Sequence, residues 1–285
     1  MKSNVAILTD TNSGITMQKA KELGVHLILM PILIDGEVYL EEKDIQKDFF
    51  FEKLGSNADV TTSQPSPGDI LDKFDTLLKE YEEVVYIPMS SGLSGTCQTA
   101  TMLAADYDGK VHVVDNQRIS VTMRQSVLDA VALAEEGKSG AEIKAYLEED
   151  ALNAPIFIMV DTLKYLKKGG RVTAAGAAIG EVLNIKPVLK IDGGKLDAFA
   201  KARGTKQAFK TILKALETER DTRLKGKECI INGAYSGDDS VGEEWGRILR
   251  EAFPEYTIEM YELPMSICAH IGPGAMGVGI YWSYK

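Results

Sequence analysis

The sequence predicts an α/β fold in which a parallel-sheet α/β domain is followed by an α+β domain. In residues 1–150, short apolar segments alternate with segments of helix-forming composition, an order that favours right-handed crossovers and a parallel sheet with helices on both faces. After residue 150 the pattern mixes hairpins with helices, because Asp192-Gly193-Gly194 is a strong hairpin signal. We therefore predict a first domain over residues 1–150 and a second over residues 151–285.

Caps and turns place the elements of the first domain. Gly24 is well placed to end a helix, Asp35-Gly36 predicts a hairpin turn, and Ser66-Pro67 predicts a helix start. The resulting strands cover residues 4–9, 25–34, 84–87 and 110–114. The helices cover residues 16–23, 44–54, 67–82, 97–106, 120–136 and 139–149, and residues 60–67 are predicted as a polar loop.

The second domain is predicted in the same way. Apolar runs indicate strands at residues 155–160, 228–234 and 257–263 and two more within 186–200. Helices are expected at residues 163–168, 206–219 and 239–252. Residues 174–182 are almost all small, which allows close helix packing or leaves room for a slender apolar ligand, and residues 272–277 form a glycine-rich loop.

Composition excludes several classes of function. The 285 residues are 45% hydrophobic and 26% charged, as in ordinary globular proteins, and the net charge of −10 argues against a nucleic-acid partner. No apolar run approaches the ~20 residues that span a bilayer, and no secretory signal is apparent, so no transmembrane segment is expected. Three widely spaced cysteines without a CxxC pair are typical of free thiols in the cytoplasm, and three histidines make a His-built metal centre improbable.

One strand-to-helix turn combines hydroxyl groups with glycines. It contains Ser90, Ser91, Gly92, Ser94 and Gly95, between an apolar run and a helix-forming segment. Backbone N–H groups at such a turn favour an anionic guest, either a carboxylate or a phosphate. The alternative is that these side chains only cap their own helix.

A second hydroxyl-rich loop precedes a predicted helix. Thr61, Thr62, Ser63 and Gln64 are expected at the edge of the sheet where the parallel strands end, which is where ligands bind in open α/β sheets. Hydroxyl and N–H groups from both loops can form a neutral anion clamp. A clamp of this kind can hold a carboxylate without a buried counter-charge.

The residues leave an enzymatic function open. Ser94 or Ser91 could act as a nucleophile with His270 as the base, although the GxSxG pattern of hydrolases is only half present. A Walker A sequence is absent, and the GxGxxG match at residues 272–277 lies far from the first strand and contains proline. Arg203 and His270 are uninformative by themselves.

Seven segments, in order along nearly the whole chain, carry a family resemblance. They are VAILTDTNSGI (5–15), TSQPSPGD (62–69), SSGLSGTCQTA (90–100), DTLKYLKKGGR (161–171), GAAIGEVLNIKPVL (176–189), KARG (201–204) and HIGPGAMG (270–277). Together they resemble the DegV family, which includes the fatty-acid-binding subunit of bacterial fatty acid kinase.

The resemblance implies that a long-chain fatty acid lies between the two domains, with its tail in an apolar tunnel to which the second domain contributes. Thr62 and Ser94 would bind the carboxylate, assisted by backbone amides of residues 92–96. The full set expected to bind the ligand is Thr62, Ser63, Ser91, Gly92, Ser94, Gly95, Arg171 and His270. Arg203 and His270 would also bear on the phosphate or on docking of the kinase.

The resemblance also implies that binding of the lipid and its phosphorylation are carried out by different proteins. A separate kinase subunit would supply ATP and metal, and the chain itself would need no cofactor and perform no catalysis. A transient contact with a membrane is compatible with this role. The preferred hypothesis is thus a cytoplasmic lipid carrier. The alternatives are an acyl- or phosphoryl-group hydrolase or transferase and a regulatory protein with a structural lipid.

Overall fold

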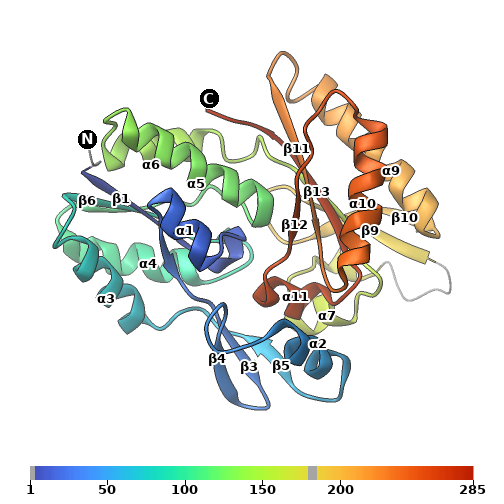
Figure 1. Cartoon of the computed structure of the whole chain (residues 1–285), viewed down its shortest axis with the longest axis horizontal. Coiled ribbons are helices and arrows are strands. Elements are labelled where there is room, and N and C mark those ends of the chain that lie inside the picture. Colours follow the sequence, from blue (N-terminus) through green and yellow to red (C-terminus); the bar gives the residue numbers. More distant parts are fainter. Residues whose placement is uncertain (1–3, 179–184, 285) are drawn as a thin grey trace.

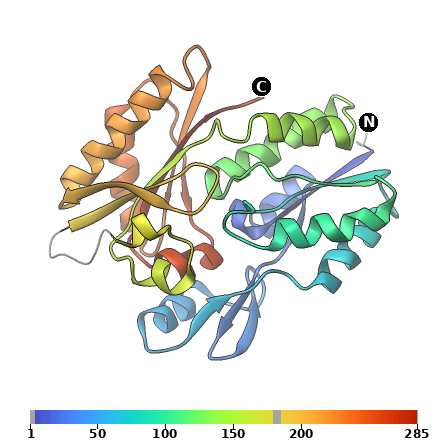
Figure 2. The same cartoon turned by 180° about the vertical axis from the view of Figure 1, so that it is seen from behind.

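The computed structural model describes residues 4–178 and 185–284 (Figures 1 and 2). Two large sheets lie on opposite sides of the molecule, and a small third sheet forms a lobe beside both (Figure 1). The α/β class predicted from the sequence is confirmed.

The first sheet has four parallel strands in the order β2 (His26–Ile28), β1 (Val5–Asp10), β6 (Glu83–Ile87) and β7 (Val111–Val113). Successive side chains of β1 alternate between its faces, so Ile7 packs with α1 (Met17–Leu23), α5 (Ser120–Glu135) and α6 (Gly140–Glu149). Leu8 packs on the other face with α3 (Pro67–Leu77) and α4 (Thr96–Ala104). Both faces are buried, as expected for a parallel sheet.

The small sheet is antiparallel and has the order β4 (Glu37–Leu40), β3 (Pro31–Ile34) and β5 (Val60–Thr62). Strand β5 corrects the prediction of a loop over residues 60–67, since Thr62 pairs with Ile32. Helix α2 (Lys47–Gly55) belongs to the same lobe and begins three residues later than predicted. The reason is that Asp44, the expected cap, instead accepts a hydrogen bond from the N–H of Leu40.

The second large sheet has six strands in mixed orientation. One face is covered by α9 (Thr205–Asp221) and α10 (Asp239–Ala252), and the other faces the rest of the molecule (Figure 2). Its strand order is β10 (Asp197–Arg203), β9 (Ile185–Ile191), β8 (Ile156–Met159), β13 (Met276–Trp282), β11 (Cys229–Tyr235) and β12 (Met260–Glu262).

Three short helices lie against the inner side of this sheet or close to it: α7 (Lys164–Gly169), α8 (Ala174–Ala177) and α11 (Met265–Ile271). The short 3-10 turns η1 (Thr11–Ser13) and η2 (Ala105–Tyr107) complete the described elements. Neither α11 nor β13 was predicted, and α3 ends at Leu77, five residues before the predicted end. Part of the predicted small-residue segment (174–182), namely residues 179–182, lies outside the described residues. The same holds for residues 179–184 of the family segment at 176–189.

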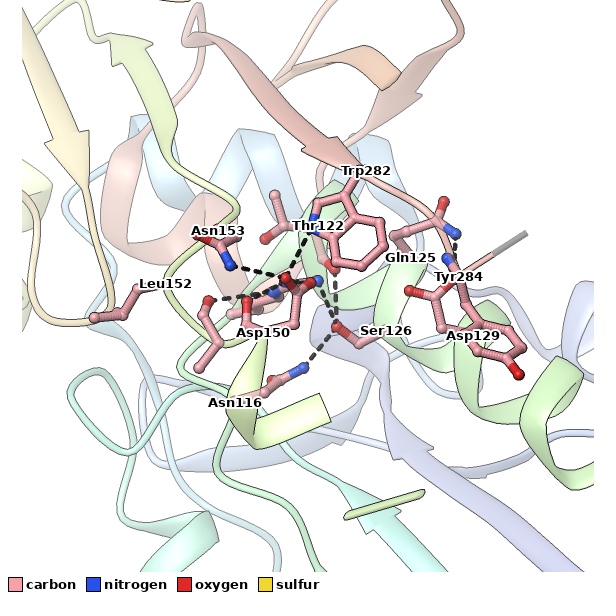
Figure 3. Close-up of polar contacts among 12 residues, drawn as sticks. Asn116, Thr122, Gln125, Ser126, Asp129, Asp150, Leu152, Asn153, Trp282 and Tyr284 are labelled. Atoms are coloured by element: carbon pink, nitrogen blue, oxygen red, sulfur yellow. Dashed lines mark hydrogen bonds and ion pairs between the residues drawn. The ribbon is translucent and has the colours of Figure 1, made fainter. Parts of the chain in front are cut away.

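A buried ion pair lies where the chain passes from the first large sheet to the second. The Arg118 guanidinium donates to the Asp150 carboxylate, and the indole N–H of Trp282 donates to the same carboxylate at 2.8 Å. Figure 3 shows Asp150 between Trp282 and the side chain of Asn153. Strands β1 to β7 precede Asp150 and strands β8 to β13 follow it, so the two large sheets divide at the residue where we predicted the domain boundary. That residues 1–150 and 151–285 form two independent domains remains a prediction.

Candidate functional site

A pocket lies at the carboxyl ends of β1 and β6, where the first large sheet, the small sheet and α11 meet. This is the edge at which ligands bind in open parallel sheets. The pocket has eight polar side chains in its lining, contributed by both halves of the chain: Asn12, Thr62, Ser63, Gln64, Ser94, Arg171, Ser266 and His270.

A second pocket adjoins the first and is lined almost entirely by apolar side chains. The two pockets share Ile119, Leu196, Ile267 and Ile271 in their walls. The second pocket runs along the inner face of the six-stranded sheet, where β8, β9, β11 and β13 supply Ile156, Ile158, Ile191, Ala234, Gly277 and Val278. A polar pocket thus lies directly beside an apolar one, with four side chains forming walls of both.

Helix α11 forms a wall of both pockets. Ser266 and His270 are four residues apart, so they lie on one face of the helix, one turn from each other, and both line the polar pocket. Ile267 and Ile271 repeat the same spacing and line both pockets. One short helix therefore presents a polar stripe to one end of the site and an apolar stripe to the other.

His270 is held between two groups from different parts of the chain. Its Nε2 lies 2.8 Å from Thr62 Oγ1, and its Nδ1 faces the backbone of Gly169, where an added Cβ would come within 2.2 Å. Burial, and secondly the positive charge of Arg171, lower the pKa of His270 to about 4. The imidazole is consequently neutral at physiological pH and can exchange a hydrogen bond with Thr62 in either direction.

Arg171 brings a cation to the polar pocket. It follows Gly170, whose left-handed backbone (φ 67°) ends α7 and turns the chain. Arg171 Nε donates to the carbonyl of Leu93 at 3.1 Å and Nη1 donates to the carbonyl of Gly169, which fixes the guanidinium beside the turn that carries Ser94. Among the described residues, no carboxylate lies within ion-pair distance of Arg171, so the charge is available to an anionic guest.

Within the 90–96 turn, most polar groups are already used. The Ser94 hydroxyl lies 2.9 Å from the Thr96 hydroxyl and accepts from the Thr96 N–H. The N–H groups of Leu93 and Ser94 both donate to the carbonyl of Ser90, and that of Gly92 donates to the Ser90 hydroxyl. The Ser94 side chain reaches the pocket, whereas the amides of residues 92–94 and 96 have acceptors inside the turn.

The predicted site residues divide into two groups. Thr62, Ser63, Ser94, Arg171 and His270 come together in the polar pocket. The other four predicted residues are not among the described residues that line either pocket. They are Ser91, Gly92, Gly95 and Arg203.

Each of these four residues has another environment. Ser91 is exposed and its N–H donates to Asp115, and Gly95 packs against the side chain of Gln64. Gly92 permits close contact with the 193–194 hairpin turn, since an added Cβ would lie 2.8 Å from Gly194 Cα. Arg203 is exposed at the end of β10.

Several pocket residues escaped the sequence analysis. Asn12 lies within a family segment that we quoted, but nothing in its local pattern indicated a ligand. Ser266, Ile267 and Ile271 lie on α11, which was not predicted, and Leu196 lies just before β10. A polar-apolar repeat at four-residue spacing in Met265–Ile271 was the available signal.

The enzymatic alternative requires a hydrogen bond between a serine and His270. Among the described contacts, His270 Nε2 pairs with Thr62, and Ser94 pairs with Thr96. Neither Ser91 nor Ser94 has a hydrogen bond to the imidazole in this part of the chain. The arrangement is therefore not that of an activated serine.

Other features bear on the remaining expectations. All three cysteines are unpaired and buried, and burial raises the pKa of the Cys97 thiol to about 11. Residues 4–178 and 185–284 contain no cluster of metal-ligating side chains, and no helix among them has the length and apolarity to cross a membrane.

Comparisons with known proteins agree with this architecture. The chain matches the DegV family, described as uncharacterised proteins, over residues 4–283. A curated DegV domain-containing protein of Clostridium acetobutylicum is 30% identical over 283 residues, covering 97% of this chain and 97% of the relative.

Two solved structures illustrate the similarity. A structure described as showing fatty acid binding by a DegV family protein of Thermus thermophilus is 33% identical, with a TM-score of 0.87 over 98% of this chain and 99% of the other. DegV of Bacillus subtilis, described as a fatty acid binding protein, is 29% identical, with a TM-score of 0.83 over 99% of this chain and 100% of the other.

Proposed function

The chain belongs to the DegV family, and from this premise we propose that it binds one long-chain fatty acid and presents the carboxyl group to a separate kinase for acyl phosphate formation. The observation that carries the proposal is that a polar pocket and an apolar pocket lie side by side and share four wall residues. A pocket with several hydroxyl groups and with Arg171, which has no ion-pair partner among the described residues, adjoins a pocket with apolar walls, and this is the polarity of a fatty acid. The relatives described as fatty acid binding proteins support the same assignment.

In the proposed complex, the polar pocket holds the carboxylate. Arg171 supplies the positive charge, while the hydroxyl groups of Thr62 and Ser94 donate hydrogen bonds to the carboxylate oxygens. Neutral His270 orients the Thr62 hydroxyl from the other side. Ser63 also lines this pocket and is a further candidate donor.

The apolar pocket accounts for the tail. Burying a chain of about 14 methylenes contributes at most about 11 kcal/mol at ~0.8 kcal/mol each, before the costs of association are subtracted. Most of the affinity would therefore come from the tail, and the polar groups would determine where the carboxyl group points.

The kinase is the second part of the proposal. Arg203 is exposed and lines neither pocket, which supports a role in docking the kinase or in meeting the phosphate instead of in holding the lipid. The partner would supply ATP and metal. We place this function in the cytoplasm, where buried, unpaired cysteines are usual.

The first test is chemical identification of the ligand. Organic extraction of the purified protein followed by mass spectrometry should recover a long-chain fatty acid, and the delipidated protein should take up added fatty acid. A preparation that contains no lipid and also takes up none would refute the proposal.

Four single variants and one double variant test the assignment of the polar pocket. Thr62→Ala and Ser94→Ala should each weaken fatty acid binding by ~1–3 kcal/mol without unfolding the chain. The matched controls are Thr61→Ala, whose side chain points to the other face of β5, and Ser91→Ala, which lies outside the pocket; both should bind normally. Wild-type binding by the double variant Thr62→Ala/Ser94→Ala would show that the carboxylate lies elsewhere.

Arg203 is tested separately. Arg203→Ala should leave lipid binding intact and slow phosphorylation of the bound acid by the cognate kinase. Equal loss of both activities would assign Arg203 to the lipid site instead.

A further inference from the structure

A buried carboxyl group lies next to the start of α11. Glu41 follows β4, and the residue is only 2% exposed. Among the described residues, no basic side chain forms an ion pair with it. A carboxylate in this setting would be an unpaired buried charge, which is costly unless the group is protonated.

Three groups contact the two oxygens of Glu41. Thr11 Oγ1 lies 2.5 Å from Oε2, Ser266 Oγ lies 2.8 Å from the same oxygen, and the N–H of Ser266 donates to Oε1 at 3.0 Å. Glu41 and Ser266 are 225 positions apart in the sequence. The contact therefore anchors the beginning of α11 to the N-terminal half of the chain.

The number of available protons indicates the protonation state of Glu41. The Ser266 hydroxyl also lies 3.0 Å from Asn12 Oδ1, and that oxygen cannot donate, because the Asn12 amide nitrogen is directed to Asp10. Three contacts between oxygens, Thr11–Glu41, Glu41–Ser266 and Ser266–Asn12, need three protons. The two hydroxyl groups supply two, and a protonated Glu41 supplies the third.

We infer that Glu41 is a positioning residue that, as a neutral carboxylic acid, fixes Ser266 at the start of α11 and thereby holds His270, one turn further along, against Thr62. The inference rests on the proposed function, because the lipid site is what the positioned imidazole serves. Glu41 itself lines neither of the two lipid pockets.

The charged surroundings of Glu41 agree with a neutral group. Glu42 is its neighbour in the chain, the Cys268 thiol faces it from α11, and Asp10 lies beyond Asn12. Lys47 and Glu262 lie at the rim of the adjoining surface pocket, where Lys47 is paired with Glu262 and Asp239. Burial raises the pKa of the Glu41 carboxyl.

The protonation state is tested by stability as a function of pH. A carboxyl group that keeps its proton in the folded state, but loses it from about pH 4.3 in the unfolded chain, lowers stability as the pH rises. The unfolding constant of the wild type, divided by that of Glu41→Gln, should therefore rise about tenfold per pH unit above ~4.3, up to the folded-state pKa.

The positioning role is tested by the ring nitrogen signals of His270 in the NMR spectrum of the lipid-free protein. With only three histidines, His270→Gln assigns the signals. Glu41→Ala should raise the titration midpoint of His270 from about 4 towards its ordinary value, and it should weaken fatty acid binding about tenfold. Glu41→Gln should restore the wild-type signals and bind within about threefold of the wild type, since its amide can donate to Ser266.

Each result bears on one claim. A pH-independent stability ratio would show that Glu41 is ionised, and wild-type His270 signals in Glu41→Ala would show that it does not position the imidazole. If Glu41→Ala does not fold, the pH series with Glu41→Gln still decides the protonation state of Glu41. In that case, His270 signals of Glu41→Gln that differ from those of the wild type would overturn the positioning role. If the wild type takes up no fatty acid, the proposed function fails, while both lipid-free measurements still decide the role of Glu41.

Discussion

The contact between Gly169 and His270 provides the sharpest test of the polar pocket. Replacing Gly169 with alanine would place a methyl group 2.2 Å from His270 Nδ1 and 3.0 Å from Cε1, whereas ordinary contacts begin at 3.4 Å. The imidazole must therefore retreat by about 1 Å or more. It cannot move directly away, because Thr62 Oγ1 already lies 2.8 Å from Nε2 on the other side of the ring.

The expected outcome is a tilted imidazole that no longer bonds Thr62. Losing one hydrogen bond at a buried site costs about 1–3 kcal/mol, so Gly169→Ala should weaken fatty acid binding by roughly 5- to 150-fold. The stability should fall by less than the lost hydrogen bond costs, because alanine is favoured over glycine in a helix by about 0.5–1 kcal/mol, which offsets part of the loss. Binding is measured by calorimetric titration of the delipidated protein, with thermal unfolding in parallel.

Gly55→Ala is the matched control, because Gly55 is also the last residue of a helix and has open space where the new methyl group would lie. It should bind like the wild type. If Gly169→Ala binds fatty acid as tightly as Gly55→Ala does, the imidazole does not orient the carboxylate clamp, and the proposed role of His270 is wrong.

Two further predictions concern stability. Asp150→Ala should destabilise the protein by about 3–5 kcal/mol in denaturant unfolding, because it leaves the buried Arg118 guanidinium without its carboxylate partner (Figure 3). A loss below 1 kcal/mol would show that the ion pair is hydrated. The pKa of His270 is lowered in the folded state, so the unfolded chain binds a proton first as the pH falls from about 6.5 to about 4. The free energy of unfolding of the wild type should therefore drop relative to that of His270→Gln by up to about 3 kcal/mol between these pH values. A constant difference between the two proteins at pH 7 and pH 5 would contradict the buried, neutral imidazole.

The parts of the fold that were predictable from sequence are those with strong local signals. The capping box at Ser139 and Glu142 opens α6 as predicted, and the hairpin at Asp35-Gly36 joins β3 to β4. The parallel sheet was predictable because its strands are continuous apolar runs.

Elements with weak local signals were missed. Helix α11 has seven residues and no side-chain cap of its own, since the group that bonds its first turn is the distant Glu41. Strand β13 contains Gly277 and Gly279, which lower strand propensity and are accommodated by close packing in the sheet. Both elements form only because of tertiary contacts, which a local pattern cannot reveal.

The candidate site shows the same division. Arg171 was assigned through the family resemblance, and Thr62 also through its hydroxyl-rich loop, whereas Ser91 and Gly92 were predicted from the hydroxyl and glycine content of the turn that carries Ser94. The turn uses its own amides for internal hydrogen bonds, a detail that depends on backbone geometry. Membership of the same turn was therefore a poor guide to which residues line the pocket.

The polar and apolar residues of α11 lie on one short helix, which has a consequence for how different fatty acids would be distinguished. Ile267 and Ile271, which are proposed to contact the acyl chain, and His270, which is proposed to face the carboxyl group, lie on one helix of seven residues, so we expect them to move together. A lipid that fills the far chamber badly would therefore also displace the imidazole at the near end. Selection among acids would then be expressed in how fast the head group reacts, and not only in how long the lipid stays bound.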